Sequence, residues 1–325
     1  SPACGIVISR RTTPETSTSI CSPMVRTVRG LPVILITGMM GLPMAKNLVE
    51  AGYTVTVFDL DAGAIEEAQG FGASPASTGA EVAAQSDIII TMVPDSPHVE
   101  AAIAGNGGII EGIRPESVVI EMSTILPETG KRMAELLAEK GADFVDAPVT
   151  GGVAGAEAGS MSILVGGDAE AFERTLPVLS VLGGDITHMG PVGAGHTTKI
   201  ANQLIGVATL AGLSEAFVLA KKSGLDMQTF YDAVKNGAGR SWALETLGPK
   251  ILKGDFSPGF MVKHMQKDLR LAGQLADDTG TSIPTTSLIA QLYHAVQAES
   301  PEAINQGHQA LIQAIEKLSN AEARS

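Results

Sequence analysis

The first part of the chain alternates short apolar runs with longer stretches that carry apolar residues at helical spacing. Most of the short runs are rich in β-branched residues and end in a turn with glycine, proline or a polar residue. Strands that alternate with helices in this way predict a mostly parallel sheet covered by helices on both faces. The predicted strands span residues 33–36, 54–58, 87–92, 118–121, 144–146, 162–165 and 186–189. The main helices predicted between them span residues 42–52, 96–104, 127–140 and 169–181.

Helical spacing alone dominates the second part of the chain. Its longest pattern covers residues 197–223 and ends at Gly224, a residue type that commonly terminates helices. Shorter helices are predicted at residues 227–236, 242–253, 261–279, 287–298 and 301–319. We therefore expect a doubly wound, mostly parallel α/β domain at residues 30–193 and an all-α domain at residues 194–320, joined by a long interdomain helix.

Residues 1–29 fit neither pattern. They are rich in Ser, Thr and Arg and carry a single acid, Glu15. Such a composition is typical of an organelle transit peptide, but no helical amphipathic period accompanies it here. We expect a disordered or artefactual tail and a cytoplasmic protein. The alternative is a transit peptide, which would indicate the mitochondrial matrix.

Composition and charge narrow the range of partners. Apolar residues make up 44% of the chain, and the formal net charge is −13. An acidic surface repels nucleic acids and anionic membranes, and no apolar run approaches the roughly 18 residues of a membrane helix. Both cysteines, Cys4 and Cys21, stand near the beginning of the chain, and the six histidines lack metal-ligand spacing. The sequence predicts a reducing compartment and no metal site, nucleic acid or membrane partner.

A glycine-containing turn follows the first predicted strand and precedes a predicted helix. It comprises Thr37, Gly38, Met39, Met40 and Gly41. In such a turn the backbone N–H groups and the helix N-terminus bind a pyrophosphate. Asp59 ends the second strand about 20 residues after Gly38, where an acid accepts from a ribose 2′-hydroxyl. Since this carboxylate would repel a 2′-phosphate and no arginine follows it, the Rossmann-type pattern favours NAD over NADP.

The dinucleotide pattern is incomplete. The usual G-x-G-x-x-G spacing would place its first glycine at position 36, where this chain has Ile36. A β-branched residue does not easily adopt the tight turn that this glycine provides. Ile36 therefore keeps a non-catalytic dinucleotide-binding scaffold open as an alternative of another class.

Three further segments follow predicted strands and are expected at the same edge of the sheet. They are Val93-Pro94, Ser123-Thr124 and Thr150-Gly151-Gly152. In open α/β sheets, ligands bind at the carboxyl ends of the strands. The sequence thus predicts a ligand site beside these turns.

The stretch GPVGAGHTTKIANQ links the two predicted domains. Its glycines end the sheet region, and Lys199 stands in the first turn of the long helix, just before Asn202 and Gln203. A lysine at a domain junction beside a nucleotide crevice is a candidate proton donor and acceptor. The ordinary alternative is a solvated lysine on a helix surface.

Four separated blocks resemble the β-hydroxyacid dehydrogenases, the group of 3-hydroxyisobutyrate dehydrogenase, tartronate semialdehyde reductase and the glyoxylate/succinic semialdehyde reductases. The blocks are ITGMMGLPMAKNL, DAPVTGG, the glycine pattern before Lys199, and the KDL that begins at Lys267. The resemblance covers residues 33–318, and the GRSW at 239–242 is closer to the 3-hydroxyisobutyrate members. A rival resemblance is 6-phosphogluconate dehydrogenase, which has a longer helical domain and a histidine where this chain has Asn202.

The resemblance to this family implies roles for single residues. Lys199 would be the catalytic residue. The implied substrate-binding residues are Ser123, Thr150, Gly151, Gly152, Asn202, Gln203, Phe260 and Lys267. The implied cofactor-binding residues are Thr37, Gly38, Met39, Met40, Gly41, Asp59, Val93, Pro94, His98, Thr124 and Lys267.

Elementary chemistry asks for the same groups. Hydride transfer to a carbonyl leaves an alkoxide, so a protonated Lys199 would supply the proton and stabilise the charge. Burial beside a second cation such as Lys267 would lower its pKa and let it also accept a proton. The expected activity is NAD-dependent hydride transfer to or from a small 3-hydroxy acid or its semialdehyde, with tartronate or succinic semialdehyde/glyoxylate reduction as alternatives. The expected assembly is a homodimer or homotetramer formed through the helical domain.

Overall fold

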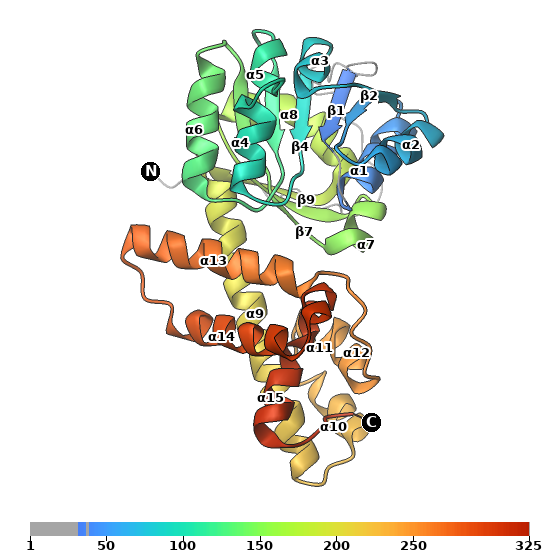
Figure 1. Ribbon diagram of the computed structural model, residues 1–325, viewed down its shortest axis with the longest axis vertical. Coiled ribbons are helices and arrows are strands. Elements are labelled where there is room, and N and C mark those ends of the chain that lie inside the picture. The colour runs from blue at the N-terminus through green and yellow to red at the C-terminus, as the bar shows by residue number, and fades with distance from the viewer. Residues whose placement is uncertain (1–31, 37–38, 325) are drawn as a thin grey trace, which may run out of the picture.

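The computed structural model describes residues 32–36 and 39–324, with the side chains described from residue 39 onward. A sheet covered by helices forms one domain and a group of helices forms the other, and a single long helix, α9, runs from one into the other (Figure 1). The predicted fold class is confirmed: an α/β sheet domain precedes an all-α domain.

The sheet places its first strand at the centre of a parallel array. Within the described residues its order is β3-β2-β1-β4-β5-β6-β8-β7, with β9 also pairing with β8. The pairs from β3 to β6 are parallel, whereas β8 runs antiparallel to β6 and β7. The strands are β1 (Pro32–Ile36), β2 (Thr54–Phe58), β3 (Ser74–Pro75), β4 (Ile88–Thr91), β5 (Val118–Glu121), β6 (Asp143–Asp146), β7 (Val149–Thr150), β8 (Met161–Gly166) and β9 (Gly183–Gly190).

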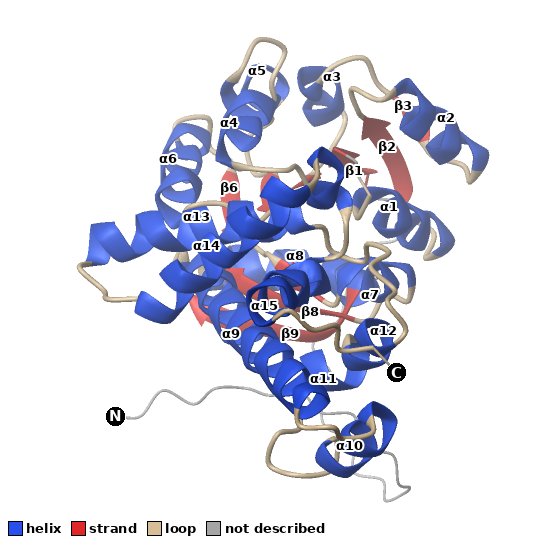
Figure 2. Ribbon diagram, turned by 60° about the horizontal axis from the view of Figure 1, so that its bottom comes forward, coloured by secondary structure: helices blue, strands red, loops and turns tan. Residues whose placement is uncertain are grey.

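Both faces of the sheet are buried, which explains why its strands read as continuous apolar runs. Ile88 and Ile90 of β4 belong to the same hydrophobic cluster as α1 and α8, whereas Ile89 belongs to the cluster beneath α4 and α6. Figure 2 shows the red strands between these helices. The helices of this domain are α1 (Gly41–Glu50), α2 (Ala62–Gly70), α3 (Gly79–Ala84), α4 (Ser96–Ala104), α5 (Ile109–Gly112), α6 (Pro127–Ala138), α7 (Gly152–Glu157) and α8 (Ala169–Leu182).

The helical domain has its own core, centred on the fully buried rings of Phe217 and Tyr293. Two helices expected to be continuous are divided. The expected helix at 242–253 ends at Thr246, and a second helix begins at Gly248 with Pro249 in its first turn, because proline cannot donate to a preceding carbonyl. The expected helix at 301–319 begins as two short 3-10 helices. The elements are α9 (Ala194–Lys222), α10 (Met227–Val234), α11 (Trp242–Thr246), α12 (Gly248–Leu252), α13 (Val262–Thr279), α14 (Pro284–Glu299), η1 (Pro301–Asn305), η2 (His308–Ala310) and α15 (Leu311–Ser319).

The start of α9 lies directly against the sheet. A Cβ atom on Gly195 would lie 2.3 Å from the Leu164 carbonyl oxygen of β8, a distance that no side chain tolerates. Two residues earlier, Gly193 has φ +93°, a left-handed conformation that strongly favours glycine. These two glycines let the chain turn sharply and bring the first turn of α9 into contact with the strand edge.

Helix α9 is apolar over a length that would be sufficient to cross a membrane. It contains an 18-residue window with mean hydropathy 1.6, so the statement that no apolar run approaches membrane-helix length is wrong for this segment. Of that window, 39% is buried inside the chain, where α9 packs against α11, α13, α14 and α15. The apolar side chains of α9 therefore provide a packing surface within the helical domain.

Candidate active site

The carboxyl ends of the central strands meet at one edge of the sheet. The last residue of β1, Ile36, pairs with Phe58 at the end of β2 and with Thr91 at the end of β4. Thr91 in turn pairs with Glu121 at the end of β5. Because β1 lies between β2 and β4, the strand order reverses here, and such a reversal forms a crevice for ligands.

Helix α1 begins at Gly41, a few residues after the end of β1 at this edge. Met40 precedes the helix without a side-chain cap, the first turn carries no acid, and Gly41 is buried. Met39 is 55% exposed, whereas Thr37 and Gly38 lie outside the described residues. Uncapped N–H groups and the helix dipole suit the pyrophosphate of a dinucleotide.

Asp59 stands next to this helix end, directly after β2. Its side chain is half-buried, and one carboxylate oxygen, Oδ1, accepts from the Asp61 N–H over 2.8 Å. This contact holds the carboxylate at the strand edge, beside the turn between β1 and α1. An acid at this position, directly after the second strand, is the type of residue that contacts an adenosine ribose in dinucleotide-binding sheets.

Ser123 is almost completely buried at the end of β5, with 2% exposure. Its Oγ accepts from the Val93 N–H over 2.8 Å, and its own N–H donates to Glu121 Oε1 over 2.9 Å. Ser123 does not cap the following helix, because α6 has Leu126 at its N-cap and no side-chain cap. Ser123 is instead fixed between two strand ends.

Lys199 is buried, with 7% exposure, and lies in a chain of polar contacts. Its Nζ donates to Gln203 Oε1 over 2.9 Å, and Gln203 Nε2 donates to Asp268 Oδ2 over 2.7 Å. Asp268, which is 2% exposed, belongs to α13. A carboxylate from the second long helix is thus joined to the lysine through one amide side chain.

Lys267 connects this chain of polar contacts to the edge of the sheet. Its Nζ lies 2.9 Å from Asp268 Oδ1 in an ion pair outside hydrogen-bond geometry, and it donates to the Thr124 carbonyl over 2.6 Å. A second ion pair joins Arg270 of α13 to Asp95, which begins α4. Lys267 therefore connects the helical domain to the sheet domain, and its ion pair with Asp268 is largely buried.

The pKa of Lys199 is lowered to about 8, because burial and the positive charge of Lys267 lower it while the negative charge of Asp268 raises it. Desolvation is the largest of these influences because it disfavours the ammonium form. A lysine with this pKa can either donate or accept a proton near neutral pH. This property distinguishes Lys199 from a solvated helix lysine.

The remaining predicted residues of the helical domain and of the start of α4 are exposed or half-buried. Asn202 is exposed, and its Nδ2 donates to Gln203 Oε1 over 3.3 Å. Pro94 and His98 are exposed around the start of α4. Phe260 is half-buried before α13, with its ring centroid 5.6 Å from those of His264 and His308.

The predicted Thr150-Gly151-Gly152 turn lies where β7 passes into α7. Thr150 ends the short strand, and Gly151, with φ +135°, precedes the helix. Both glycines are exposed. The turn follows β6 closely in the chain, so it lies on the side of the edge away from Asp59.

Four buried charged or titratable residues around the site were not predicted from the sequence: Glu121, Asp146, His196 and Asp268. Asp268 follows Lys267 in the KDL block and was given no role. Glu121 and Asp146 each follow buried apolar residues at the end of a strand, and an acid in that position is a signal that could have identified them. His196 stands three positions before Lys199 and carried no separate signal.

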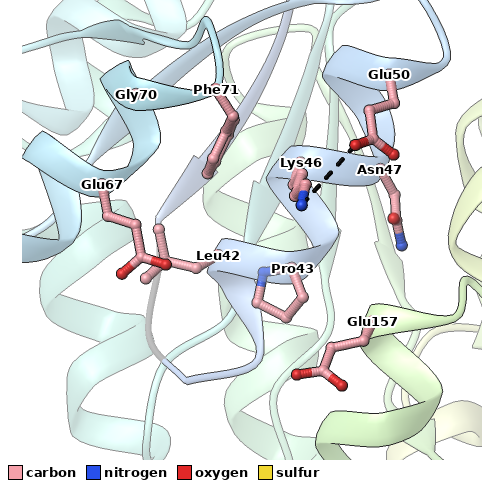
Figure 3. Close-up of a pocket in the computed structure, with 9 residues that line it drawn as sticks. All are labelled: Leu42, Pro43, Lys46, Asn47, Glu50, Glu67, Gly70, Phe71 and Glu157. Carbon is pink, nitrogen blue, oxygen red and sulfur yellow. Dashed lines mark ion pairs between the residues drawn. The ribbon is translucent and has the colours of Figure 1, made fainter.

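A groove on the other side of α1 contains none of the predicted site residues. Its volume is 490 Å³, and residues from α1, α2 and α7 surround it (Figure 3). Lys46 and Glu50 pair across 3.9 Å at its wall, with Glu67 and Glu157 nearby. Across the described part of the chain, no cluster of His, Cys, Asp and Glu could hold a metal ion.

Comparison with known proteins connects this geometry to a family. Residues 34–190 match the NAD binding domain of 6-phosphogluconate dehydrogenase, and residues 193–315 match the NAD-binding region of NADP-dependent 3-hydroxyisobutyrate dehydrogenase. A 2-(hydroxymethyl)glutarate dehydrogenase from Eubacterium barkeri is 40% identical over 80% of this chain and 87% of its own length. The 2-hydroxy-3-oxopropionate reductase of Escherichia coli is 38% identical over 87% of this chain and 96% of its own.

A solved structure agrees with both relatives. The 3-hydroxyisobutyrate dehydrogenase of Mycobacterium tuberculosis, described with L-serine, superposes with a TM-score of 0.81 and 32% identity over 88% of this chain and 99% of its own. The two halves, the edge of the sheet and the sequence relationships all lead to one assignment. The chain belongs to the β-hydroxyacid dehydrogenase family and is an NAD-dependent oxidoreductase of hydroxy acids.

Proposed function

We propose that the protein interconverts a small 3-hydroxy acid and its semialdehyde, with Lys199 as general acid and base. The observation that supports this most strongly is the buried chain Lys199–Gln203–Asp268–Lys267, which ends on the Thr124 carbonyl beside Ser123. It joins a lysine of lowered pKa to the strand edge at which the dinucleotide site forms.

Proton transfer requires neutral Lys199 for oxidation of the hydroxy acid and protonated Lys199 for reduction of the semialdehyde. When bound, the nicotinamide would supply the hydride acceptor for oxidation of the carbinol carbon and, in its reduced form, the hydride donor for the reverse reaction. Neutral Lys199 Nζ takes the hydroxyl proton as the carbonyl forms, and the ammonium form returns that proton to the oxygen. The charge of the ammonium also stabilises negative charge that develops on the oxygen.

The names of the relatives indicate one substrate class. Their compounds share a carboxylate and, on the second carbon away from it along the chain, a hydroxyl or aldehyde group. Ser123 and the turn Thr150-Gly151-Gly152 supply hydroxyl and N–H groups for the carboxylate. Asn202, Gln203 and Lys267 would contact the substrate from the helical side, and Phe260 would close the site.

The cofactor residues follow the same logic. The α1 N-terminus, with Met39, Met40 and Gly41, would hold the pyrophosphate, and Asp59 would accept from the ribose and exclude a 2′-phosphate. Val93, Pro94, His98 and Thr124 would lie along the nicotinamide ribose. Lys267 lies at the boundary between the two groups.

A screen of small hydroxy acids and semialdehydes with NAD and NADP in parallel tests the proposed substrate class. We expect turnover of 3-hydroxyisobutyrate, L-serine or tartronate semialdehyde. The kcat/KM should be higher for NAD by about tenfold or more, a ratio that corresponds to a difference of about 1.4 kcal/mol. Turnover confined to 6-phosphogluconate, or NAD binding without any turnover, would refute it. Faster turnover with NADP would show that Asp59 does not select the cofactor.

The pH dependence should reveal the state of Lys199. Because oxidation requires the neutral amine, kcat for oxidation should rise with pH and level off above about 8, whereas kcat for reduction should fall there. Asp268→Asn removes the charge that raises the pKa of Lys199, so both midpoints should move to lower pH. Initial rates in both directions between about pH 6 and pH 10 provide the measurement. A flat profile, or midpoints that move upward in the variant, would contradict the assignment.

We also propose that two copies of the chain associate through α9. Ile205 and Leu219 are 71% and 69% exposed, and Gly212 stands between them at seven-residue spacing. Such spacing keeps residues on one face of a helix and suits packing against a second helix. Since this face is apolar and open in the single chain, a second copy would bury it.

Light scattering on the purified protein tests this association. The chain mass is 33.4 kDa, and we expect a dimer or tetramer at micromolar concentration. The double substitution Ile205→Glu with Leu219→Glu should yield the monomer because it places charges on the contact face. Leu60→Glu, at a 94% exposed position of the sheet domain, is the matched control and should leave the mass unchanged. A monomeric parent protein would end the proposal.

A further inference from the structure

We propose that Glu121, His196 and Asp146 form a buried positioning cluster that sets the place of Lys199 relative to Ser123. All three side chains are completely buried beneath the strand edge, with 0% exposure. The inference rests on the proposed function, because it concerns how the two residues of that site are held together. The cluster adds three positioning residues to the proposed site, and none of them has to contact the substrate or the Lys199 side chain.

Glu121 connects the two sides through its two oxygen atoms. Oε1 accepts from the Ser123 N–H over 2.9 Å, and Oε2 lies 2.7 Å from His196 Nε2. One carboxylate at the end of β5 therefore contacts both the backbone of Ser123 and a side chain in the first turn of α9. The distance between Ser123 and α9 depends on this group.

Asp146 anchors the same turn of α9 from the neighbouring strand. Its Oδ1 accepts from the Gly193 N–H over 2.7 Å, and its Oδ2 accepts from the His196 N–H over 2.8 Å. Gly193 has no side chain with which to cap the helix, so the acid of β6 performs this task. The negative charge also lies at the positive end of the helix dipole.

The packing around the cluster leaves it little freedom. His196 Nδ1 has no hydrogen-bond partner and lies 3.6 Å from Asp146 Oδ2. A Cβ on Gly130 of α6 would lie 3.0 Å from the same nitrogen, so that helix closes the cluster from outside. Buried carboxylates are costly to desolvate, and their contacts here serve geometry at the edge of the site.

The link to Lys199 runs through the helix itself. His196 precedes Lys199 by three residues, which is slightly less than one helical turn, so a shift of the first turn moves the lysine with it. An error of about 1 Å in the position of a reacting group can reduce the rate roughly 100-fold. Neither acid contacts the Lys199 ammonium, so the cluster acts on the lysine through position.

Kinetics of three variants test the proposal. His196→Leu removes the partner of Glu121 and should lower kcat by about 100-fold, while the Kd for NAD stays within about threefold. His196→Gln keeps a donor toward Glu121 and should retain kcat within about tenfold of the parent. Asp146→Asn keeps the shape but replaces one acceptor with an NH₂ group and should lower kcat by about tenfold. His294→Leu, at an exposed histidine of α14, is the control.

Hydrogen exchange provides a readout that needs no turnover. If Glu121 links the two sides, His196→Leu should speed exchange at the Ser123 N–H as well as at Gly193 and His196. A merely structural histidine would reduce the yield of folded protein but leave kcat per NAD-binding molecule unchanged. That result, or an unchanged Ser123 N–H, would overturn the proposal. If the parent chain oxidises no hydroxy acid, the proposed function fails, and the exchange experiment still decides whether the link exists.

Discussion

The contact between the first turn of α9 and the sheet edge is the constraint on which the rest of the structure depends. Gly195 permits it, because any side chain there would enter the Leu164 carbonyl. The contact brings Lys199 to the place where the strands of a dinucleotide-binding sheet end. Without it, the lysine would be an ordinary cation on the surface of a helix, with a pKa unsuited to accepting protons.

The second domain supplies the charged neighbours of that lysine. Helix α13 brings Asp268 and Lys267 against the start of α9, where they exclude water and contribute opposing charges. Desolvation lowers the pKa of Lys199, and the acid limits how far it falls. If Lys199 is to gain and lose a proton near neutral pH, it needs neighbours from both domains. The junction of the domains is the place where one side chain can have both.

Long periodic elements could be predicted from the sequence, whereas contacts between distant segments could not. Residues 54–58 and 118–121 form strands as expected because both sheet faces bury their β-branched side chains. The helices α2 and α3 were missed, since short Ala- and Gly-rich segments show little periodicity. Lys199 could be singled out from its glycine pattern. The partners of the site could not, because Glu121 and His196 are 75 residues apart and Gln203 and Asp268 are 65 apart.

The role of Lys199 as the proton donor and acceptor is the central claim, and the turnover of Lys199→Met tests it most directly. Methionine has a similar length and no charge, so the Kd for NAD should stay unchanged while kcat falls by about a thousandfold in both directions. Lys235→Met, at a distant lysine of the helical domain, should behave as the parent protein does. A Lys199→Met protein that turns over at the parent rate would contradict the account.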